Sequence, residues 1–286
     1  MAQSGVWTGG GKLSRLKNRL PLVVYLFIVI IILGFLSLLM GSTRISASRI
    51  SLSVIAPWNN QNVSSIVWNI RMPRLMLEAF SGTLIAMAGS ILLGIFGTIM
   101  LDNPAVRVLY LLDCAVAAIA VFLIVFGFNL NALYPLILGS LAGTTWDKVF
   151  VAILFILIGI IIYVFYYKDL NAILFGEYTA KTLGVEVWRT RSFLMIMALI
   201  LCAAAAYSGG LMCLAGLILP YFVRLAVGVN HKYLIPVSIL ASASLMILID
   251  IFSRIVFPAE LPLGIIMAVL CGPLYIFALQ RRRLGL

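Results

Sequence analysis

Three acidic residues, Glu78, Asp113 and Asp250, lie in or beside long apolar runs. An ionised carboxylate at the centre of a bilayer costs about 2.5–3.5 kcal/mol on insertion scales, so it normally faces a partner charge or water. Arg74 precedes Glu78 by four residues and Arg254 follows Asp250 by four, which places each pair one helical turn apart. We interpret Glu78 and Asp250 as members of ion pairs near the membrane surface, and we expect Asp113, about five residues into its span, to reach the inner interface. Proton or ion binding is the alternative.

The other residues that could do chemistry form no catalytic or metal-binding set. The only histidine, His231, falls in a predicted turn, where we expect it to be exposed to solvent. A metal site needs several ligands. The cysteines are isolated in apolar runs, as is typical of small buried side chains: Cys114, Cys202, Cys213 and Cys271. We therefore predict no enzyme activity, and no metal or cofactor bound by this chain.

The composition indicates a membrane protein. Of the 286 residues, 64% are apolar and only 10% are charged, whereas about 25% are charged in a typical soluble domain. The apolar residues form unbroken runs close to the roughly 20 residues that a transmembrane helix needs. A formal charge of +11 could suggest nucleic-acid binding, but the basic residues lie in short segments between the runs, where they report topology. We predict an all-α, polytopic bundle in the lipid bilayer and exclude nucleic acid as a partner.

About eight spans are predicted, at residues 21–40, 74–97, 108–127, 149–167, 193–207, 211–227, 234–252 and 263–280. Basic residues within the N-terminal segment 1–20 place that segment in the cytoplasm, and alternation then puts fourteen of the twenty Lys and Arg residues inside. Both termini are then cytoplasmic, and residues 21–286 form one transmembrane domain. The outer segment 41–71 could include a short surface helix, and 168–192 is the largest inner loop.

Small residues recur at every fourth position of the second span: Gly82, Ala86, Ser90 and Gly94. They share one helix face, which we expect to be buried against another helix of the bundle or of a second subunit. The fifth and sixth spans are short and interrupted at Gly209, Gly210, Gly216 and Pro220. Interrupted spans often line a transport path; a tight helical hairpin with a proline kink is the alternative.

The inner loop has its own pattern. Glu177, Ala180, Lys181 and Gly184 follow each other at helical spacing. This spacing predicts a short amphipathic helix that ends at Gly184. Such a helix would dock a cytoplasmic partner or lie on the membrane surface.

Eight short segments occur in an order known from one family of transporters. They are Arg71-Met72-Pro73-Arg74, Gly139-Ser140-Leu141 with Trp146, Leu183-Gly184-Val185, Gly209 to Arg224, Asn230-His231-Lys232, Asp250 with Arg254, Glu260-Leu261-Pro262-Leu263-Gly264, and Gly272-Pro273. Across residues 71–97 and 134–283 the chain resembles the permease subunits of type II ABC importers for iron-siderophores, haem and vitamin B12. It differs in having Pro220-Tyr221 where the family has Pro-His, and in lacking two of the family's ten spans.

The resemblance implies a permease in the cytoplasmic membrane of a prokaryote, paired with a second permease as a homodimer or heterodimer. ATP and Mg would bind to a separate ABC ATPase dimer, and an extracytoplasmic binding protein would deliver the ligand. The resemblance assigns docking of the binding protein to Arg71, Arg74 and Arg254. It assigns coupling to the ATPase to Glu177, Ala180, Lys181, Leu183, Gly184 and Val185.

Three functions are compatible with these patterns. The first is ATP-driven import of an iron-siderophore, haem or corrinoid. The second is ion-coupled secondary transport by Glu78, Asp113 or Asp250. The third is a shortened scaffold that retains the docking surfaces without transport.

Overall fold

The computed structural model describes residues 19–40, 61–96, 144–210, 216–256, 266–267, 269–275 and 277. All regular structure in these ranges is helical, which confirms the predicted all-α class. The long helices are α2 (Arg19–Leu39), α5 (Met72–Phe96), α7 (Trp146–Leu174), α9 (Val187–Gly209) and α11 (His231–Val256). The short ones are α4 (Gln61–Ile66), the π-helical segment η1 (Val67–Arg71), α8 (Glu177–Thr182) and α10 (Leu219–Val227).

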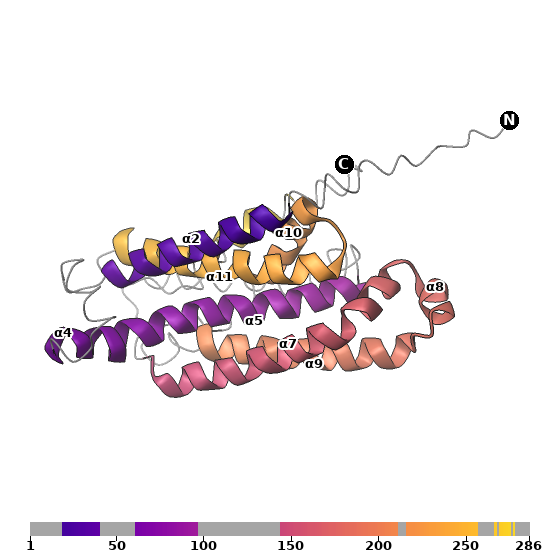
Figure 1. Cartoon of the computed structure of the whole chain (residues 1–286), viewed down its shortest axis with the longest axis horizontal. Coiled ribbons are helices and arrows are strands. Elements are labelled where there is room, and N and C mark those ends of the chain that lie inside the picture. Colours follow the sequence, from indigo (N-terminus) through magenta and orange to yellow (C-terminus); the bar gives the residue numbers. More distant parts are fainter. Residues whose placement is uncertain are drawn as a thin grey trace, which may run out of the picture.

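Helix α5 runs through the middle of the bundle (Figure 1). Helices α2 and α11 lie on one side of it, and α7 and α9 lie on the other. The segment that contains α5 is 72% buried within its apolar window, against 17% for α2 and 22% for α7. Small and apolar residues occupy every face of α5, so it can contact helices on all sides. The large exposed apolar side chains of α2 and α7 suit contact with lipid.

Five helices in the described ranges are long and apolar enough to cross a membrane: Pro21–Leu39, Ser64–Phe96, Trp146–Leu174, Val187–Gly209 and His231–Ile255. They coincide with the predicted first, second, fourth, fifth and seventh spans, and the chain is a multi-pass membrane protein. A shorter apolar helix, Gly216–Val227, covers most of the predicted sixth span. Helical residues 269–275 lie within the eighth. The third predicted span, 108–127, lies outside the described residues, as does 1–18 of the N-terminal segment.

Helices α7, α9 and α11 extend beyond both ends of the apolar runs from which they were predicted. The outer segment before Arg71 contains α4 and η1, which continue directly into α5. The expectation of a short fifth span is wrong, because α9 has 23 residues. Its first turns carry Arg189 and Arg191, which extend the helix beyond the apolar run that marks the span. Hydropathy detects the apolar, membrane-embedded part of a helix and not its polar ends.

Three glycines of α5 bring its backbone unusually close to neighbouring segments. A Cβ atom added at Gly82 would lie 2.6 Å from the backbone oxygen of Ser242 in α11, and one at Gly89 would lie 2.9 Å from the backbone oxygen of Leu217. At Gly94 it would lie 2.7 Å from His231 Nε2. Gly82 and Gly89 meet backbone atoms, which cannot move aside easily, so these two positions require glycine for steric reasons. Gly89 lies outside the four-residue pattern seen in the sequence.

We expect Gly82→Ala to lower the free energy of unfolding by about 1–3 kcal/mol, because a backbone oxygen cannot move aside as a flexible side chain can. Gly34→Ala is the matched control, since its added Cβ would meet Leu75 Cδ2 at an ordinary 3.7 Å. Both changes raise helix propensity equally. Thermal unfolding of the detergent-solubilised chain measures the difference, and equal melting temperatures for the two variants would contradict it.

Candidate functional site

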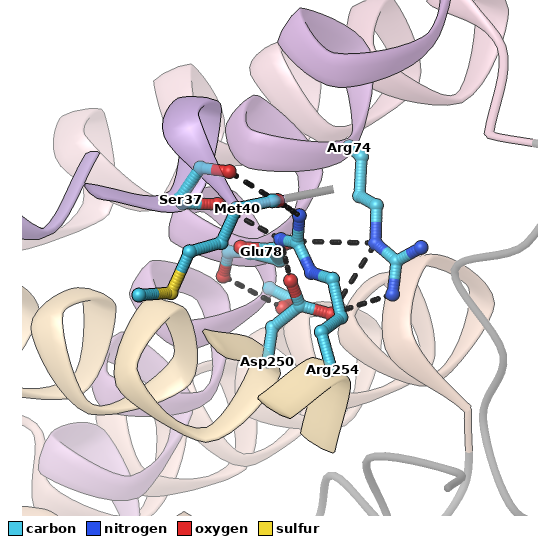
Figure 2. A network of polar contacts seen from close by, with 7 residues as sticks. Ser37, Met40, Arg74, Glu78, Asp250 and Arg254 are labelled. Atoms are coloured by element: carbon cyan, nitrogen blue, oxygen red, sulfur yellow. Dashed lines mark hydrogen bonds and ion pairs between the residues drawn. The ribbon is translucent and has the colours of Figure 1, made fainter. Parts of the chain in front are cut away.

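Two arginines and two carboxylates meet at one end of the bundle, where α2 ends, α5 begins and α11 ends (Figure 2). Arg74 Nη2 lies 2.8 Å from Asp250 Oδ1, and Arg74 Nε lies 3.6 Å from Glu78 Oε1. Arg254 Nη2 pairs with Asp250 Oδ2 and lies 3.3 Å from Glu78 Oε1. Each arginine therefore contacts both carboxylates. We call these four residues the outer charge cluster.

The outer charge cluster is balanced in charge and nearly closed to solvent. Glu78 and Asp250 are fully buried, and the side chains of Arg74 and Arg254 are 15% and 10% exposed. Burial of ions is costly unless each finds a partner of opposite charge. The two local pairs predicted from sequence, Arg74 with Glu78 and Asp250 with Arg254, are confirmed. The two pairs that join α5 to α11 depend on tertiary structure alone.

The same end of the bundle holds the last turn of α2. Arg254 Nη1 donates to the carbonyl of Met40 at 2.8 Å, and Arg254 Nη2 donates to the hydroxyl of Ser37 at 2.8 Å. Arg71 donates to the carbonyl of Leu38. The last carbonyls of a helix have no partner within it, so Arg71 of η1 and Arg254 of α11 supply a cap for α2. The three predicted docking residues lie together at this end, and each contacts another residue of this chain: Arg71, Arg74 and Arg254. Docking of a binding protein by these arginines stays a prediction.

The opposite end carries α8, between the end of α7 and the start of α9 (Figure 1). The prediction of a short helix ended by Gly184 is confirmed. Gly184 has a φ of +83°, its N–H donates to the carbonyl of Lys181, and the N–H of Val185 donates to the carbonyl of Ala180. This pattern is a Schellman motif, which terminates helices at a left-handed glycine. The turn is therefore specified by local sequence.

Helix α8 is anchored by one small residue and exposes the rest. Ala180 is fully buried and packs with Ala172, Ile173 and Val187. Tyr178 is 84% exposed and Leu183 is 66% exposed. Large apolar side chains exposed beyond the ends of the spans are typical of a surface that contacts another protein or the membrane. The exposed members of the predicted coupling set are Glu177, Lys181, Leu183 and Gly184, and Val185 is partly buried.

A hollow beside α8 extends this surface. It is lined by Lys181, Gly184, Val185, Glu186, Val187, Trp188 and Arg189. Trp188 lies at the edge of this hollow, and its side chain is 82% exposed. A surface ion pair between Glu177 and Arg191 joins the start of α8 to α9, and a pair between Glu186 and Arg189 lies at the first turn of α9.

The residues of the predicted interrupted region are all buried: Gly209, Gly210, Gly216 and Pro220. Gly210 ends α9 with a φ of +88°. Pro220 does not kink a helix as one alternative supposed; it lies in the first turn of α10, where a missing N–H has no cost. A Cβ added at Gly216 would lie 2.9 Å from Met267 Cε and 3.1 Å from Ile85 Cγ2. The region packs against α5, and a role in the transport path stays a prediction.

His231 was expected to be exposed, and this expectation is wrong. Its side chain is fully buried. Its backbone N–H donates to Asn171 Oδ1 at 2.9 Å, and its Nδ1 lies 3.0 Å from the same oxygen. The space it fills exists because position 94 is glycine. Within the described residues, no three His, Cys, Asp or Glu side chains form a group that could hold a metal ion.

Comparison with known proteins relates this geometry to transporters. The model of the FecCD transport family matches residues 29–101 and 110–281. The hemin transport system permease protein HmuU of Yersinia pestis is 26% identical over 335 residues, which cover 94% of this chain and 98% of that protein. The cobalamin import system permease protein BtuC of Halobacterium salinarum is 33% identical over 186 residues, which cover 65% of this chain and 48% of that protein.

A solved chain shares the fold. It comes from an ABC transporter assigned to the metal-chelate type, in an inward-facing conformation. The TM-score is 0.65 at 20% identity, with 91% of this chain and 98% of that chain covered. The alignment with the hemin permease is 335 residues long, whereas this chain has 286. The relative therefore contains residues that have no counterpart here.

Proposed function

This chain belongs to the FecCD transport family, and we propose that it is the membrane-spanning permease subunit of an ATP-driven importer. The proposal rests chiefly on α8, a rigidly capped helix that projects with exposed apolar residues from one end of a multi-pass bundle. The described basic residues at that end include Arg19, Lys168, Lys181, Arg189, Arg191, Arg224 and Lys232. A basic surface is typical of the cytoplasmic side. The membrane would be the cytoplasmic membrane of a prokaryote.

The partner at α8 would be an ABC ATPase dimer that binds ATP and Mg. Tyr178 and Leu183 would enter a cleft of the ATPase, while the buried Ala180 transmits the displacement of α8 to α7 and α9. The permease would pair with a second copy or a similar chain. Its own role would be to form the path and to change conformation, with the chemistry of ATP hydrolysis confined to the partner.

The partner at the opposite end would be an extracytoplasmic binding protein. Arg74 and Arg254 already share Glu78 and Asp250, so an acidic side chain of that protein would compete with internal carboxylates. Docking would then weaken the contacts that join α2, α5 and α11. In this way it would couple delivery of the ligand to opening of the path on the outer side.

The ligand would be a metal chelate or macrocycle: an iron-siderophore, haem or a corrinoid. The named relatives transport hemin and cobalamin, and both alignments support this class.

A scaffold without transport is the second candidate, and the residues missing relative to the hemin permease favour it. Secondary transport by Glu78 or Asp250 is less well supported, because both are held between arginines. Asp113 lies outside the described residues.

The decisive experiment is uptake by the reconstituted importer. The chain, its ATPase and its binding protein are placed in proteoliposomes, and entry of an iron-siderophore, of hemin and of cobalamin is measured with ATP or a non-hydrolysable analogue inside. We expect one of these three ligands to enter only with ATP. ATPase association without uptake would assign the scaffold, and uptake driven by an ion gradient without ATP would assign secondary transport.

A further inference from the structure

A second hollow lies at the same end of the bundle as α8 but between other elements. It is lined by Asn171, Leu174, Phe175, Arg224, Val229 and Asn230, and its volume is about 370 Å³. These residues come from the end of α7, the last turn of α10 and the turn before α11. Pockets for small ligands begin at about this volume.

The amide oxygens in this hollow are already used. Asn171 Oδ1 accepts the backbone N–H of His231 at 2.9 Å and lies 3.0 Å from His231 Nδ1. Asn230 Oδ1 accepts Asn171 Nδ2 at 3.2 Å and the backbone N–H of Lys232 at 3.0 Å. The backbone donors also fix which way each amide points. The free hydrogen-bonding capacity of both amides therefore consists of N–H donors.

Arg224 supplies a positive charge to the same hollow. Its Nη1 is buried without a hydrogen-bond partner in the described part of the chain. No carboxylate lines the hollow, and Arg224 takes part in none of the ion pairs between described residues. A buried guanidinium N–H left without an acceptor is costly. A hollow that is lined by a cation and by amide N–H donors, and whose side-chain amide oxygens are occupied, selects an anion.

The hollow lies at the depth of lipid headgroups. Leu174 is the last residue of one candidate span, and Val229 follows the last residue of the apolar helix Gly216–Val227 by two positions. Phe175 is 78% exposed and Val229 is 50% exposed, so the walls present apolar surface as well. Lys232 Nζ lies 5.9 Å from the ring centroid of its neighbour Tyr233. Tyrosine and lysine together are typical of the membrane surface.

We propose that this hollow binds the phosphate group of an anionic phospholipid. Arg224 and the N–H groups of Asn171 and Asn230 would contact the phosphate oxygens, and Phe175 and Val229 would contact the glycerol and the first acyl carbons. Basic pockets between transmembrane helices on the cytoplasmic side commonly hold such headgroups. The site depends on membrane insertion and is independent of the transported ligand.

Native mass spectrometry of the purified full chain tests the proposal, with phosphatidylglycerol, phosphatidylcholine and inorganic phosphate titrated separately. We expect wild type to retain phosphatidylglycerol in preference to phosphatidylcholine, and Arg224→Gln to weaken this retention at least about tenfold through loss of a charge-assisted hydrogen bond. Arg189→Gln is the matched control, because Arg189 is an exposed cation at the same end that lies outside the hollow. It should retain the lipid as wild type does.

Val229→Glu supplies an independent variant. Val229 is half exposed, so the change removes little packing while placing a carboxylate beside Arg224. It should abolish lipid retention with a melting temperature close to that of wild type. Retention by Arg224→Gln or Val229→Glu equal to that of wild type would overturn the proposal. Displacement of the lipid by an equal concentration of inorganic phosphate would also overturn the proposal and would assign the site to a free anion. Displacement of the lipid by the ATPase would overturn it as well.

Discussion

Glu177→Arg combined with Gly184→Pro is expected to abolish association of the ATPase while leaving the chain inserted in the membrane. Proline fixes φ near −65°, whereas residue 184 needs +83°. Proline also lacks the N–H that donates to the carbonyl of Lys181 at 3.0 Å. The arginine at position 177 would face Arg191, the present ion-pair partner of Glu177. Both changes displace α8 at the surface where we place the ATPase.

Co-purification of the ATPase with the tagged permease measures this effect, and a loss of at least about tenfold is expected from removal of a central contact of an interface. Leu183→Asp separates docking from local folding, because Leu183 is 66% exposed and its replacement leaves the turn intact. It should weaken co-purification to a similar extent. Thr179→Ala, an exposed position on the same helix, is the control. Unchanged co-purification of both disruptive variants would remove α8 from the mechanism.

Asp250→Asn is expected to be the most destabilising single change at the outer end. It leaves Arg74 and Arg254 sharing only Glu78, so one buried positive charge has no counter-charge. Loss of one partner from a buried ion pair typically costs about 3–5 kcal/mol. We expect a lower melting temperature in detergent and a lower amount of protein in the membrane, both in the absence of any binding protein.

A second substitution that restores the charge balance should recover part of this loss. Arg74→Met combined with Asp250→Asn leaves one positive and one negative charge, Arg254 and Glu78, at 3.3 Å. The double variant should therefore be more stable than the sum of the two single effects predicts. Asp147→Asn, an exposed acid at the same end of the bundle, is the control and should have little effect. Strict additivity would show that the outer charge cluster does not act as a unit.

The sequence alone was sufficient wherever the controlling interactions are local. Bilayer thickness sets the length of a span, so apolar runs were enough to locate the five long helices that the structure describes. Residues four apart meet on one helix, so the pairs Arg74–Glu78 and Asp250–Arg254 could be predicted without a structure. The Schellman turn at Gly184 likewise depends on neighbouring residues only.

Only the tertiary structure decided which helices meet and what each charge contacts. Arg74 and Asp250 are 176 positions apart, and no periodicity links them. His231 looked like a solvated turn residue because the residues that bury it, Asn171 and Gly94, belong to two other helices. Arg224 looked like one more topological charge until the fold placed it among amides whose oxygens are already occupied. Local sequence sets helix length and end, whereas the partner of a buried polar group depends on packing between distant segments.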